Sequence, residues 1–82
     1  MTWFEAEEID IYLKKLERML DEWRMAPMEM RIEAAELSRV REKVEVVSND
    51  DTQNPVLREY LSEMKHRIEV CKGQIHERLK RK

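Results

Sequence analysis

Apolar residues recur at alternating spacings of three and four along almost the whole chain, and this periodicity restricts the fold more than any other feature. The clearest series is Leu57, Leu61, Met64, Ile68, Cys71 and Ile75. Because an α-helix has 3.6 residues per turn, this spacing places the series on one helix face. Glu, Lys, Arg, Leu and Met, which are strong helix formers, dominate the composition, and glycine occurs once. The sequence therefore predicts an all-α fold.

Three such series divide the 82 residues into three amphipathic helices, at approximately 3–25, 27–47 and 55–80. Thr2 and Glu5 form a capping box before the first helix, and Asn54-Pro55 marks the start of the third. We expect a single domain, a small helical bundle with coiled-coil-like seams. The first two apolar series are Ala6, Ile9, Leu13, Leu16, Leu20 and Trp23, and then Met30, Ala34, Leu37, Val40, Val44 and Val47.

The junction between the first two predicted helices is Ala26-Pro27. Proline disfavours the α conformation of the residue before it and lacks a backbone donor, so the first helix breaks here. One alternative is a reversal into an antiparallel helix. The other is a kinked rod of about 45 residues, whose spare apolar surface a second copy of the chain would cover. The reversal is favoured because each apolar series is sufficient for its own helix, although no glycine is present to cap the first helix.

A second set of apolar residues lies off these main faces. It consists of Trp3, Phe4 and Ile11 in the first helix and Met28 and Ile32 in the second. Clustered exposed apolar surface usually marks an interface, and methionine and aromatic residues are enriched there. We expect these five residues to bind a protein partner, either a second copy in a homodimer or a different protein. The alternative is that they belong to a wide core or are scattered on the surface.

Residues that could support chemistry are few. His66, Cys71 and His76 are five residues apart, which puts them on different faces of one helix, so no metal site is expected. Cys71 lies in the apolar series and is expected to be buried. No glycine-rich phosphate loop is present, since Gly73 is the only glycine. The sequence thus predicts a non-enzymatic protein without a cofactor.

The charge and hydropathy of the sequence limit the kinds of partner and the cellular location that we expect for this protein. The single cysteine excludes an internal disulfide, and no apolar run approaches the length that spans a bilayer, so we expect a cytoplasmic protein without membrane contact. The net charge of −2 gives no general attraction to nucleic acid. A weak nucleic-acid binder is nevertheless one alternative, through the basic residues Arg78, Lys80, Arg81 and Lys82.

The expected function is that of an adaptor or inhibitor acting through exposed helix faces, a profile found among small phage and mobile-element regulators. A second alternative is a designed or recombined helical scaffold without a natural partner. Few glycines and dense Glu, Lys and Arg favour that alternative. Six methionines and a glycine in the middle of the third helix oppose it.

Overall fold

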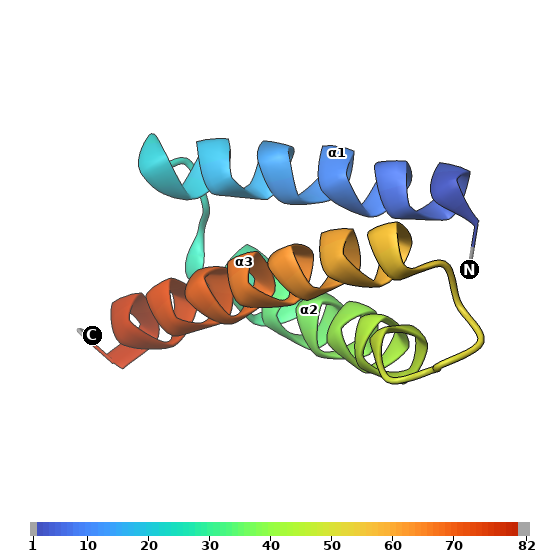
Figure 1. Ribbon diagram of the computed structural model, residues 1–82. Helices are drawn as coiled ribbons and strands as arrows, with labels where there is room; N and C mark the ends of the chain where they lie inside the picture. The colour runs from blue at the N-terminus through green and yellow to red at the C-terminus, as the bar shows by residue number, and fades with distance from the viewer. Residues whose placement is uncertain (1, 81–82) are drawn as a thin grey trace.

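The computed structural model describes residues 2–80, which form three helices, each running roughly antiparallel to the one before it (Figure 1). They are α1 (Trp3–Asp21), α2 (Pro27–Ser48) and α3 (Pro55–Lys80). The bundle is elongated, with extents of 44 × 18 × 16 Å. The prediction of an all-α bundle is confirmed. The chain reverses between α1 and α2, as favoured above, and the kinked rod is wrong.

The starts of the helices follow the sequence signals. The Thr2 hydroxyl accepts a hydrogen bond of 3.2 Å from the Glu5 backbone N–H, as an N-cap does. Ala26 is extended, with ψ 156°, and Pro27 occupies the first helical position of α2. The Asn54 side-chain oxygen accepts from the Val56 backbone N–H at 2.8 Å, where α3 begins.

The end of α1 differs from its prediction, because the helix stops at Asp21 rather than near residue 25. The Trp23 N–H donates to the Leu20 carbonyl at 3.2 Å, and the Arg24 N–H donates to the Met19 carbonyl at 3.0 Å. This pair of bonds is a Schellman motif, which requires a left-handed residue that is usually glycine. Here Trp23 takes that conformation, with φ 57°.

Trp23 was expected to belong to the apolar face of α1, and that expectation is wrong. Its side chain is 65% exposed, because the left-handed turn carries it out of the helix. The Arg78 guanidinium lies over the indole ring, 3.7 Å from the ring centroid, in a cation–π contact. Met25, which falls outside the main series, lies in the connection between α1 and α2 and is buried in the core.

The core forms around α3, which lies between α1 and α2 (Figure 1). Helix α3 packs most extensively against α2 and also against α1, whereas α1 and α2 approach each other at few positions. The periodic residues of α3 are buried as predicted. The buried set is Ala6, Leu13, Leu16, Leu20, Met25, Met30, Leu37, Val44, Leu57, Leu61, Met64, Ile68, Cys71 and Ile75. Over residues 2–80, no helix combines the length and apolar character needed to cross a membrane.

Candidate functional site

The seam between α1 and α2 is hollowed along its length, and we call this feature the α1–α2 groove. Three hollows lie end to end, with Tyr12 shared by the first two and Glu5 and Lys43 by the last two. The first hollow has a volume of about 300 Å³. The full lining is Glu5, Glu8, Ile9, Tyr12, Lys15, Leu16, Met19, Glu29, Ile32, Glu33, Glu36, Val40, Glu42, Lys43, Val46 and Val47.

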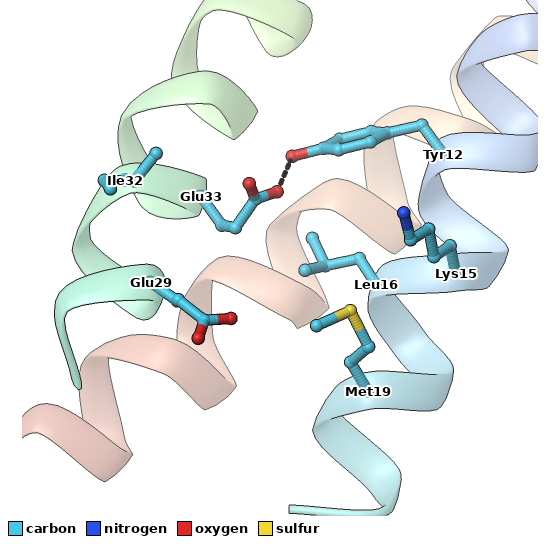
Figure 2. Close-up of a pocket in the computed structure, with 7 residues that line it drawn as sticks. All are labelled: Tyr12, Lys15, Leu16, Met19, Glu29, Ile32 and Glu33. Carbon is cyan, nitrogen blue, oxygen red and sulfur yellow. Dashed lines mark hydrogen bonds between the residues drawn. The ribbon is translucent and has the colours of Figure 1, made fainter. Parts of the chain in front are cut away.

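Figure 2 shows how the two helices build the first hollow. Leu16 and Met19 point from α1 towards α2 and form an apolar floor, while Ile32 lies at the outer border on α2. Leu16 is buried and Met19 half-buried, so part of this apolar surface is open to contact. The hollow is therefore a shallow apolar depression between the facing sides of two antiparallel helices rather than an enclosed cavity.

One hydrogen bond crosses the groove. The Tyr12 hydroxyl donates to the Glu33 carboxylate at 2.5 Å, as Figure 2 shows. Burial of the phenol, and then the adjacent Glu33 carboxylate, hold the pKa of Tyr12 far above its ordinary value. The phenol therefore stays protonated and continues to donate at every physiological pH. This bond ties the two helices together at the point where the first and second hollows meet.

Ion pairs cross both interfaces of α3, and the groove has no ion pair of this kind. Between α1 and α3, Arg67 pairs with Asp10 at 2.5 Å and with Glu17 at 2.7 Å. The hydrogen bond from Arg67 holds the pKa of Asp10 below its ordinary value. Between α2 and α3, Arg41 pairs with Glu69, and Lys65 with Glu45 at 3.5 Å. Each interface of α3 thus carries cations that neutralise the facing carboxylates.

No ion pair among the described residues crosses between α1 and α2. The groove lining contains six glutamates but only two lysines, Lys15 and Lys43. Glu36 pairs only with Arg39 of its own helix, at 3.7 Å. Within residues 2–80, no ion pair involves the other carboxylates of the lining, which are Glu5, Glu8, Glu29, Glu33 and Glu42. Carboxylates without an ion-pair partner favour water, which keeps this seam hydrated. A further hollow of about 540 Å³ lies between the end of α1 and α3, but its lining includes two arginines, Arg18 and Arg78.

The five residues that the sequence assigns to partner binding are all exposed, three on α1 and two on α2. Phe4 and Ile11 are exposed on α1, at 69% and 66%, and are two helical turns apart. Met28 and Ile32 are exposed in the first turns of α2, which begins at Pro27. Trp3 stacks on Tyr60 of α3 with ring centroids 5.9 Å apart. Of the five, only Ile32 lines the groove.

The sequence reasoning missed most of the groove. Leu16 belongs to the apolar series of the first predicted helix, so we expected it in the core rather than at an open seam, and Met19 lies outside that series. A usable signal was present in the spacing of Glu29, Glu33 and Glu36, which places three carboxylates on one edge of α2.

Other groups offer little chemistry. Burial raises the pKa of the Cys71 thiol to about 11, so the thiolate that would act as a nucleophile is scarce at neutral pH. Residues 2–80 hold no group of three His, Cys, Asp or Glu side chains able to bind a metal ion. Of the basic C-terminal residues, Arg78 covers Trp23, and Arg81 and Lys82 lie outside the described residues. Comparisons with protein-family models, curated proteins and solved structures gave no match.

Proposed function

We propose that this chain is a non-enzymatic protein-interaction module, an adaptor or inhibitor, that binds a segment of a partner protein in the α1–α2 groove. The observation that carries the proposal is the open groove itself. Ion pairs cross the two interfaces of α3, while the α1–α2 interface has none among residues 2–80 and leaves an apolar floor accessible. Grooves of this kind receive amphipathic helices in known recognition modes. A cytoplasmic setting suits a chain whose single cysteine is free.

The shape of the groove supports a helical segment over a small molecule. Small-molecule sites enclose most of their ligand in one pocket. Here three shallow hollows follow one another along two helices. A helix presents apolar side chains every three or four residues on one face, and these can enter successive hollows. The predicted partner-binding residue Ile32 borders this path, while Phe4 and Ile11 lie outside it.

A synthetic helix of about 18 residues, with leucines on one face and glutamines elsewhere, provides a neutral probe. We expect its addition to shift the backbone NMR signals of Leu16, Met19 and Ile32. An Ile32→Asp variant places a carboxylate at the border of the apolar floor and should weaken binding by about fivefold or more.

Val56→Asp is the matched control for this experiment. Val56 is 63% exposed on α3 and Ile32 is 60% exposed on α2, so both substitutions replace a β-branched residue of similar exposure. The control should bind the neutral probe as the parent chain does. Absence of signal changes along the groove, or equal losses in both variants, would refute the proposed function.

A further inference from the structure

We infer that the segment bound in the α1–α2 groove is a basic amphipathic helix, with lysine or arginine on both borders of its apolar stripe. This inference rests on the proposed function and adds the chemical class of the partner. It starts from the imbalance of the lining, where six carboxylates face only two ammonium groups. Within residues 2–80, neither of these lysines forms an ion pair across the seam.

On the side of α1 that faces α3, an arginine joins the two helices through ion pairs. Arg67 of α3 reaches two carboxylates of α1 at once, at 2.5 and 2.7 Å, and the helices pack closely there. On the groove side, α1 presents Glu5 and Glu8 without an equivalent arginine. A partner helix that carried basic residues would form ion pairs with these carboxylates, as Arg67 of α3 does with Asp10 and Glu17.

The carboxylates are spaced to meet a helix. On α2 the groove is bordered by Glu29, Glu33 and Glu36, at spacings of four and three. On α1 the border continues with Glu5 and Glu8, three residues apart. Both borders follow the helical repeat. A helix lying along the groove therefore meets carboxylates of α2 in the first hollow, opposite Lys15 of α1, and carboxylates of both helices in the second hollow. Charges in such flanking positions set partner choice in coiled coils.

A second copy of the chain is a poorer occupant. A twofold dimer through the groove would place the same carboxylates opposite one another, which is repulsive. The outer side of α1 is no better suited. Glu7 and Glu8 lie between Phe4 and Ile11 in the sequence, and each is three or four residues from both. On a helix, residues at these spacings are neighbours, so this apolar pair has acidic neighbours. A different, basic chain removes the conflict.

Three versions of the synthetic helix test the inference. They share one leucine stripe and carry lysine, glutamine or glutamate beside it. In calorimetric titrations at about 50 mM NaCl, where surface charges are weakly screened, we expect the lysine version to bind at least about tenfold more tightly than the glutamate version. This preference should shrink at about 300 mM NaCl.

Neutralising variants locate the charges responsible. The double variant Glu29→Gln/Glu36→Gln should weaken binding of the lysine version by about fivefold or more and leave the glutamine version unchanged. Glu59→Gln/Glu63→Gln removes the same charge from the exposed side of α3 and should change neither affinity. Equal losses in the two double variants would mean attraction by net charge alone, and would overturn the inference.

The two proposals fail in different ways. If the lysine, glutamine and glutamate versions all bind the groove with equal affinity, the proposed function stands and the basic partner is wrong. If no version shifts the signals of Leu16, Met19 and Ile32, the groove is not a binding site and both proposals fall.

Discussion

Gly73 lies in the middle of α3, on its exposed side, where glycine is a poor helix former. A Cβ built on this residue would meet no atom within 4 Å. Gly73→Ala should therefore raise the free energy of unfolding by about 0.5–1 kcal/mol, because alanine is the better helix former, restricts the unfolded chain and meets no clash here. Urea denaturation of both proteins would measure this. A loss of stability would indicate that another chain packs against Gly73.

Cys71 sits in the core with its side chain almost fully buried. Because burial raises its pKa to about 11 and blocks access, we expect the native thiol to react with a disulfide reagent far more slowly than a free cysteine at pH 8. The same protein in denaturant should react at the ordinary rate. Fast reaction of the native protein would show that the core opens locally at α3.

At the scale of the helices, the turn after α1 is held by a tryptophan in a conformation that suits glycine. A Cβ in the left-handed region costs about 1–2 kcal/mol. Trp23→Gly and Trp23→Ala both remove the cation–π contact with Arg78, but only glycine removes that cost as well. The glycine variant should thus be more stable than the alanine variant by about 1 kcal/mol. Thermal unfolding of the pair would test this, and equal stabilities would contradict the left-handed turn.

The ion pairs of Arg67 link α1 to α3 and give the bundle part of its acid sensitivity. Arg67 holds the pKa of Asp10 below its ordinary value near 3.8, so the unfolded state takes up the proton first as the pH falls. The ion pair therefore contributes its full stabilisation above the unfolded-state pKa of Asp10, and this contribution is lost as the pH falls through the lower pKa of the folded state. In Arg67→Gln we expect a loss of about 1 kcal/mol at pH 7 and a shallower decline of stability below pH 4. Parallel acid titrations followed by circular dichroism would compare the two, and identical acid profiles would exclude the coupling.

How much of this architecture the sequence predicts depends on whether the signal is local. The apolar spacing and the caps at Thr2 and Asn54 predict the helices and the buried face of α3, because both depend on near neighbours in the chain. The left-handed Trp23 is not visible, since only the closing of the Schellman motif compensates its cost. The open groove is not visible either. It arises because Arg67 and Arg41 neutralise carboxylates on the α3 side, and their partners lie 50 or more and 28 residues away.

At the scale of the whole molecule, the exposed apolar residues are spread over all three helices and the α1–α2 connection. They are Trp3, Phe4, Ile11, Trp23, Met28, Ile32, Val46, Val56 and Val70. A stable dimer usually buries about 800 Å² on each partner in one continuous patch. Because these residues belong to three helices and a connection, we expect no single patch of this size and therefore a monomeric isolated chain.

The proposed complex between this chain and a basic helix has a stoichiometry that can be predicted from the position of the groove. The groove occurs once per chain, so one basic helix should bind one monomer, and sedimentation equilibrium of the mixture should give the mass of a 1:1 complex at several concentrations. Replacing Phe4 and Ile11 with serine should change neither this mass nor the stability by more than about 0.5 kcal/mol, because both side chains face solvent. A complex of two chains and two peptides that reverts to 1:1 in this double variant would mean that the outer side of α1 is a second interface. In that case the homodimer would form through Phe4 and Ile11, back to back, while each groove stayed free for its own partner helix.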